Sequence, residues 1–170
     1  MSDSITFTIE PDWREIDRIN NQAREFLAQT LLASSGVDTY TMVLSELMEN
    51  GIKYGRGNKP IEVSVKVTRR SIRIQVDNYV DAAQLPSLKN LDRTLQWIRG
   101  IQDPYQAFLE RVRQIAREPL SDGKSCLGLV RIAYEGRADL DFILEDDRLS
   151  VSAVASLSPS MCVPETSEGV

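Results

Sequence analysis

The chain has 170 residues, 42% of them hydrophobic and 26% charged, which is typical of one globular domain with a core of ordinary size. A formal net charge of −5 without a basic stripe argues against nucleic acid as a partner. The chain has no histidine, which excludes Ser-His-Asp and Cys-His catalysis, histidine metal sites and a phosphohistidine acceptor.

The first third of the chain predicts a strand followed by two helices. Alternating apolar and polar residues predict a strand over 5–9. Apolar residues spaced by three and four then predict a helix that Asp12 caps and that stops at 34–36. A second helix is expected to begin near Asp38 and to end at a glycine-rich loop over 55–60.

The remaining segments alternate between hairpins and helices. In chain order they are strands at 61–67 and 72–76, helices within 86–118 that Gly100 to Pro104 separates, a helix at 127–133, and strands at 140–144 and 149–155. This order predicts an α+β fold, a two-layer sandwich in which helices cover one face of a mixed, mostly antiparallel sheet. Residues 1–156 would form this single domain, and the polar stretch 157–170 would be a disordered tail.

The cysteines and the N-terminus place further limits on the protein. Cys126 and Cys162 are far apart and lack CxxC spacing, so we expect neither a disulfide framework nor a zinc site. The sequence opens without a signal peptide, and no apolar run approaches the length of a membrane helix. We therefore expect a cytoplasmic protein that does not contact the membrane.

Two polar residues of the second predicted helix, Glu46 and Asn50, form the most informative pattern in the chain. Residues four apart lie on one face of a helix, so a proton-accepting carboxylate and an amide oxygen point the same way. Mg²⁺ takes oxygen ligands and few of them from protein, so the pair suits a nucleotide–magnesium site. The alternative is an ordinary solvated helix, on which the Glu-x-x-x-Asn spacing also occurs by chance.

The stretch from Val43 to Gly55 resembles the N-box of the GHKL ATPase superfamily, whose members share the Bergerat fold. That pattern is an acid, three residues, Asn, then a small and a basic residue, which here are Glu46, Asn50, Gly51 and Lys53. The resemblance implies Asn50 as the magnesium ligand, Glu46 as the general base and Lys53 as a nucleotide contact. The predicted order of strands and helices matches the same fold.

The second GHKL element is Asp-x-Gly-x-Gly after a strand, whose Asp accepts the adenine amino group. Asp77 and Asn78 stand at the end of the second hairpin strand, and both glycines are missing. The resemblance implies Asp77 as the adenine acceptor, with Asn78 in the same nucleotide site. The alternative makes Asp77 a former of the turn at the strand end, a common role of Asp and Asn, and the sequence favours neither.

The third GHKL element is a glycine-rich loop that opens a helix and binds phosphate through backbone N–H groups. Gly128 stands at its expected place, whereas Cys126 replaces the first glycine and its Cβ would hinder close approach of the backbone to phosphate. Lys124 would add positive charge to the loop, or would simply be solvated. A P-loop over 123–125 is set aside, because Glu118 stands where glycine is needed and no strand precedes the loop.

A closer resemblance covers roughly residues 40–155 and links the chain to the SiaB-like protein kinases, a GHKL branch related to anti-sigma-factor serine kinases. It rests on Asn78-Tyr79-Val80, the helices of 86–118 and the run from Leu127 to Ala133. It implies ATP and Mg²⁺ as cofactors, and phosphorylation of Ser or Thr on a small STAS-type or SiaC-type partner in bacterial signalling. Kinases of this group often dimerise, so a homodimer is allowed.

Two other functions remain open at this point. A GHKL fold with a decayed nucleotide site would sequester a regulatory partner without hydrolysing ATP, and Cys126 and the missing glycines favour it. The pairing of Glu46 with Asn50 favours the kinase, because a decayed site needs neither residue. The third function is that of a soluble α+β domain with no nucleotide site.

Overall fold

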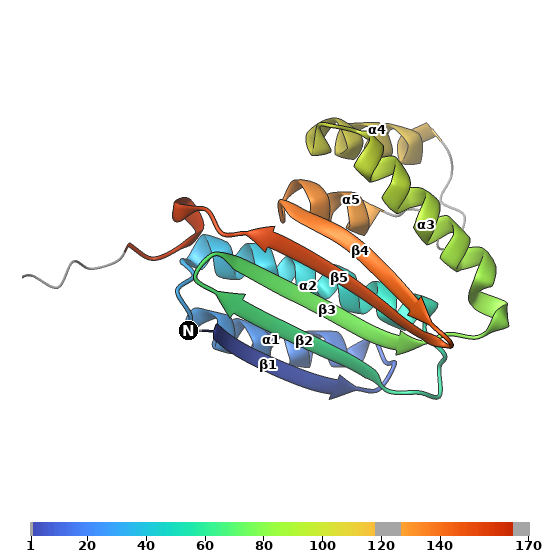
Figure 1. The fold of residues 1–170 in the computed structure, drawn as a ribbon, viewed down its shortest axis with the longest axis horizontal. Helices are drawn as coiled ribbons and strands as arrows, with labels where there is room; N and C mark the ends of the chain where they lie inside the picture. The colour runs from blue at the N-terminus through green and yellow to red at the C-terminus, as the bar shows by residue number, and fades with distance from the viewer. Residues whose placement is uncertain (1, 118–126, 165–170) are drawn as a thin grey trace, which may run out of the picture.

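The computed structural model describes residues 2–117 and 127–164, which form a two-layer α+β sandwich (Figure 1). Its sheet has five strands in the order β1-β2-β3-β5-β4, and each described pair of neighbours is antiparallel. The strands are β1 Ser2–Ile9, β2 Ile61–Thr68, β3 Ser71–Tyr79, β4 Ala138–Glu145 and β5 Arg148–Ser156. The predicted fold class is confirmed.

The helices lie on one side of this sheet. They are α1 Arg14–Ala28, α2 Ser34–Tyr54, α3 Leu85–Gly100, α4 Pro104–Arg117 and α5 Leu127–Tyr134, with 3-10 turns η1 Ala82–Gln84 and η2 Pro159–Met161. Figure 1 shows α1, α2 and α5 along one face, with α3 and α4 reaching past the β4 edge. Helix α2 packs against β2, β3 and β5 and is the central helix of this layer. Among the described helices, none has the length and apolarity that a membrane span needs.

The strands bury alternate side chains because successive residues of a strand point to opposite faces. Three cross-strand pairs of β2 and β3 face the helices and are almost fully buried: Val63–Val76, Val65–Ile74 and Val67–Ile72. The residues between them lie on the other face, which no described helix covers. The sheet therefore has one apolar face and one polar face, as expected for a half-covered antiparallel sheet.

The boundary between the first two helices differs from the prediction. Helix α1 ends at Ala28, and α2 begins at Ser34, so residues 34–36 open the second helix instead of closing the first. Gly36 lies in the first turn of α2, where an ideal Cβ would be only 2.6 Å from the carbonyl oxygen of Met161, so the glycine there allows close packing and does not end a helix. Asp38 thus lies inside the helix and is not its cap.

The start of α1 differs in a smaller way. Its N-cap is Trp13 and not the predicted Asp12. The Asp12 carboxylate still accepts a hydrogen bond from the backbone N–H of Arg14 at 2.9 Å. Asp12 therefore accepts a hydrogen bond from one of the free N–H groups at the start of α1, although it lies one residue before the N-cap.

More of the C-terminal stretch has a defined structure than the sequence predicts. Residues 157–164 belong to the expected disordered tail, yet they contain η2 and an isolated bridge between Leu32 and Cys162. The hydroxyl of Tyr40 also donates to the sulfur of Met161 at 3.4 Å. This stretch covers the connection between α1 and α2, while 165–170 lie outside the described residues.

Candidate functional site

Glu46 and Asn50 lie one turn apart on α2 and are both partly buried. The Asn50 side-chain Nδ2 donates to the backbone carbonyl of Glu46 at 2.8 Å, which fixes the orientation of the amide. Its Oδ1 accepts no hydrogen bond from the described residues, so it keeps the lone pairs that a hard cation uses. The predicted shared face of the two residues is therefore observed.

The carboxylate of Glu46 faces α5. Its Oε1 accepts from Arg131 Nη1 at 3.1 Å, and Arg131 Nε also donates to Glu135 at 2.9 Å. Burial raises the pKa of Glu46 above its ordinary value, and the nearby charge of Glu49 adds to the increase, whereas Arg131 opposes it. The hydrogen bond to Glu135 is the largest cause of the raised pKa of Arg131, so Glu135 is its stronger partner. Glu46 is thus a carboxylate with increased proton affinity, and its Arg131 contact does not offset burial.

Gly128, in the first turn of α5, allows this close contact with α2. A Cβ at Gly128 would lie 2.1 Å from Glu46 Oε2 and 3.0 Å from its carboxyl carbon. Glycine is therefore required there for Glu46 to hold its observed position. The sequence predicts Gly128 as a phosphate-loop residue, and the structure adds this contact with the predicted base.

Asn78 is a buried polar residue without a described hydrogen-bond partner. It lies in β3, its side chain faces the helices, and only 1% of the residue is exposed. Neither Oδ1 nor Nδ2 makes a hydrogen bond to any described residue, although buried amides are almost always paired. It borders a void of about 10 Å³ that Asn50, Gly51 and Tyr54 of α2 also line. The void has room for about one water molecule, and Glu46 lies outside its lining.

Asp77, the neighbour of Asn78 in β3, lies on the opposite face of the sheet. Its carboxylate accepts from Gln75 Nε2 at 3.0 and 3.1 Å and from Arg148 Nη2 at 3.2 Å. The structure therefore does not bring Asp77 together with Asn50. It also does not form a turn at the strand end, because β3 continues to Tyr79. Both predicted roles of Asp77 treat it as the end of a strand, whereas it is an interior position.

Of the two predicted lysines, the structure describes only Lys53, and it is not part of this cluster. Lys53 is exposed on α2, with its Nζ 5.2 Å from the ring centroid of Tyr54, and it does not line the void. Lys124 and Cys126 lie outside the described residues. Glu46, Asn50, Asn78 and Gly128 are therefore the predicted site residues that the structure brings to the α2 side.

The donor set around Asn50 fits a cation held mainly by a ligand. Among the described residues, no group of three or more His, Cys, Asp or Glu side chains forms a metal cage. Mg²⁺ bound to nucleotide phosphates needs only one or two protein oxygens, of which Asn50 Oδ1 would supply one. A nucleobase is larger than the void, so Leu91 of α3 and Leu129 of α5, which line it, must move apart for a base to enter.

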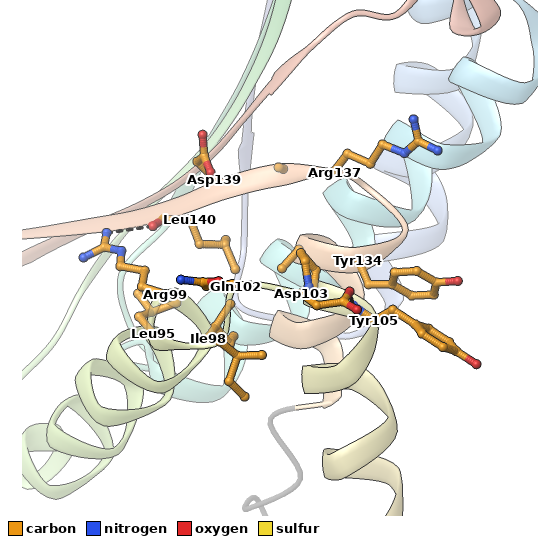
Figure 2. A pocket seen from close by; sticks show the side chains of 14 residues that line it. Leu95, Ile98, Arg99, Gln102, Asp103, Tyr105, Tyr134, Arg137, Asp139 and Leu140 are labelled. Carbon is orange, nitrogen blue, oxygen red and sulfur yellow. Dashed lines mark hydrogen bonds between the residues drawn. The ribbon is translucent and has the colours of Figure 1, made fainter.

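A larger cavity, of about 610 Å³, lies away from these residues (Figure 2). It is bounded by α3, the start of α4, the end of α5 and the start of β4, and Figure 2 shows Tyr105 and Tyr134 side by side at one end. Arg99 is engaged with the Leu140 carbonyl at 2.8 Å and with Asp141. None of the predicted site residues lines this cavity.

Arg131 is a member of the site that the sequence analysis does not identify. It reaches Glu46 from 85 positions away in the chain. Within α5 its spacing from Glu135 indicates only an ordinary i,i+4 ion pair. No local signal points to Glu46, because the contact depends on how α5 packs on α2.

Comparison with known proteins identifies a shared fold. No family model matches the chain, and neither does any curated protein. The fold is similar to that of a chain in the crystal structure of the SiaB–SiaC complex from Pseudomonas aeruginosa, with a TM-score of 0.67 and 20% sequence identity. The match covers 90% of this chain and 89% of that chain. Nearly the whole architecture described above is therefore common to both molecules.

Proposed function

We propose that the protein is an ATP-dependent kinase that phosphorylates Ser or Thr on a small regulatory partner of the STAS or SiaC type. The observation that carries the proposal is the meeting of α2, β3 and α5. Glu46 and Asn50 share one side of α2, the orphaned amide of Asn78 lies beside Asn50, and Gly128 packs on Glu46.

In this proposal Glu46 is the general base. It accepts the proton of the partner's hydroxyl as that oxygen bonds to the γ-phosphorus and the bond to ADP breaks. Its raised proton affinity, which follows from burial, suits this role because a base with a higher pKa takes a proton more readily. Bound Mg²⁺ would neutralise phosphate charge, and Asn50 Oδ1 would hold it.

The likeness to a chain of the SiaB–SiaC complex supports the choice of partner. That complex joins two proteins, so the shared fold is compatible with recognition of a small protein. We extend this to the present chain as a proposal, with a SiaC-type protein in the bacterial cytoplasm as the substrate. ATP is available there, and no described helix is a candidate membrane span.

A second candidate function is a non-catalytic module that binds its partner and has lost its nucleotide site. The small void next to Asn50 favours it, because about 10 Å³ accommodates no base unless Leu91 or Leu129 moves. The ion pair of Glu46 with Arg131 also favours it, since a paired carboxylate is a less available base. The two candidates differ in whether Mg-ATP binds.

Isothermal titration with Mg-ATP and with its non-hydrolysable β,γ-imido analogue tests the proposal. We expect both to bind wild type, and Asn50→Ala to weaken binding when Mg²⁺ is present but not when EDTA removes it. Asn58→Ala, in an exposed loop, is the matched control. If folded wild type binds neither nucleotide, the kinase proposal fails and the non-catalytic module remains as the candidate function. Phosphate transfer from labelled ATP to a SiaC-type protein of the same genome then tests the kinase itself.

A further inference from the structure

The free edge of β4 is protected along only part of its length. β4 is an edge strand of the sheet, so one side of its backbone has no strand beside it. Near its start, Arg99 of α3 donates to the Leu140 carbonyl at 2.8 Å (Figure 2), and the Asp141 carboxylate accepts from the Phe142 N–H at 3.0 Å. Both of these backbone groups therefore point away from β5. Because charged side chains satisfy them, this part of the edge is protected from pairing with another strand.

The last residues of β4, 142–145, have no such protection and form what we call the open β4 edge. Outward-pointing backbone groups recur at every second residue of an antiparallel pair, so the Phe142 carbonyl and both backbone groups of Leu144 also point away from β5. No described residue bonds to these three groups. Ile143 and Leu144 are 58% and 41% exposed. An exposed apolar edge with unpaired backbone groups is a template for a further strand.

The charges along β4 indicate what kind of strand would pair with it. Asp139, Asp141 and Glu145 alternate along β4 on the open face of the sheet. Arg99 pairs with Asp141 at 2.8 Å, whereas no described cation pairs with Asp139 or Glu145. An incoming strand would therefore meet carboxylates on one face and the apolar side chain of Leu144 on the other. Opposite charges directly across two strands stabilise the pair, so the matching strand alternates basic and apolar residues.

A second copy of this chain is a poor match for the same edge. Antiparallel pairing of two β4 strands centred on Ile143 would set Asp141 of one copy opposite Glu145 of the other. Centring the pair on Phe142 would set Asp139 opposite Glu145. Like charges directly across two strands destabilise the pair. Charge therefore favours a different protein over a second copy at this edge.

We propose that the open β4 edge binds an extended segment of a partner protein as an additional antiparallel strand. The segment carries Lys or Arg at alternate positions, opposite the carboxylates of β4. Apolar residues between them lie on the side of Phe142 and Leu144. Main-chain hydrogen bonds would supply affinity in this mode, and the alternate side chains would supply specificity. None of the predicted site residues lies in β4, so this docking surface does not depend on nucleotide binding.

The probe for this surface is a fluorescent peptide of the same length as β4, capped at both ends, that alternates Lys and Val. Titration followed by fluorescence anisotropy should show saturable binding to the full chain. Amide hydrogen exchange should slow at Leu144, whose N–H gains a partner. A peptide that alternates Glu and Val should bind about tenfold more weakly, because its charges repel those of β4.

Methylation of the peptide backbone separates strand pairing from simple charge attraction. In the proposed register the N–H groups of the Val residues point toward β4, and those of the Lys residues point away from it. N-methylation of the Val residues should therefore abolish binding. The same number of N-methyl groups on the Lys residues leaves the bonding N–H groups in place and should reduce binding far less.

Variants of the protein test the same edge from the other side. Leu144→Pro removes an outward N–H at an edge position, where proline is tolerated, so the variant should fold, as checked by thermal unfolding, and should no longer bind the Lys–Val peptide. Glu145→Lys should weaken binding about twofold to fivefold, the effect of one cross-strand ion pair. Glu10→Lys, at an exposed position just after β1, is its matched control and should bind like wild type.

The inference is overturned if folded wild type does not bind the Lys–Val peptide, or if the two methylated peptides bind equally well. It is also overturned if wild type sediments as a dimer that Leu144→Pro converts to a monomer, because a second copy would then occupy the edge. The proposed function fails or stands separately, since Mg-ATP titration reports on α2 and peptide binding reports on β4.

Discussion

The two faces of β3 near its end hold polar residues in opposite conditions. On the open face, Asp77 is surrounded by partners: Gln75 donates to it twice, and Arg148 bridges it to Glu62. On the helix face, the very next residue, Asn78, is almost fully buried and has no described partner. The carboxylate of Asp77 is therefore already paired with side chains of the same sheet face. The second leaves both atoms of the Asn78 amide without a described partner, beside a void with room for about one water molecule. Because Asn78 shares this void with Asn50, we propose the site on the helix face.

The largest expected effect comes from removing the proposed base on the helix face. Glu46→Gln keeps the size and a hydrogen-bonding oxygen but cannot accept a proton. Phosphate transfer should fall about 10²–10⁴-fold while Mg-ATP affinity is kept, as measured by single-turnover transfer and titration. Asp77→Asn, on the open face, is the control and should transfer phosphate at close to the wild-type rate. The reverse pattern would move the site to the open face.

The next effect concerns the packing of α2 on β3. A Cβ added at Gly51 would lie 2.8 Å from Val76 Cγ1 in the buried layer. Gly51→Ala should therefore lower the free energy of unfolding by about 1–3 kcal/mol, measured by urea denaturation. Gly57→Ala is the control, since no atom lies within 4 Å of its ideal Cβ position. Equal stability of the two variants would mean that α2 is not held against the sheet at this point.

A third effect is the pH dependence of stability that Glu46 contributes. Burial raises the pKa of Glu46 in the folded state. The contribution of Glu46 to the free energy of unfolding is therefore complete below its ordinary pKa of 4.5, and it is lost as pH rises through the folded-state pKa. Wild type should therefore lose stability relative to Glu46→Gln as pH increases from 4.5 toward neutral. Thermal unfolding of both proteins across this range measures the difference. A constant difference would show that the folded and unfolded proteins bind the Glu46 proton equally.

The smallest effect is expected on the open face. Arg148 is 45% exposed and pairs with Glu62 at 3.0 Å and with Asp77 at 3.2 Å. Exposed ion pairs contribute little, so Arg148→Gln should reduce the free energy of unfolding by about 0.2–1 kcal/mol, and by less at high salt. Mg-ATP affinity should not change. A large loss of affinity in this variant would contradict the assignment of the two faces.

Most of the fold is predictable because the patterns that specify it are local. Strict alternation along 61–67 and 72–76 identifies β2 and β3, and helical spacing identifies the helices on either side. The border between α1 and α2 is not predictable in this way, since residues 34–36 have the composition of a loop. In the structure they open α2, and Gly36 there lies close to Met161, a contact between residues more than 100 positions apart that no local pattern announces.

The candidate site is predictable only in part. The relation of Glu46 to Asn50 follows from helix geometry and is present in the structure. The contact of Glu46 with Arg131, 85 residues away, depends on the packing of two helices and has no signature in the sequence. Asp77 and Asn78 form one motif in the sequence, but a strand sends them to opposite faces.

The sequence by itself determined which segments become helices and strands, apart from the border between α1 and α2, and that α2 presents an acid and an amide together. These properties depend on residues within one or two turns or on a period of two. Only the tertiary structure decided that α5 packs against Glu46 through Gly128, and that Asn78 rather than Asp77 faces α2. Those outcomes depend on which face of each element the core covers, and burial of apolar surface by the whole chain sets that choice.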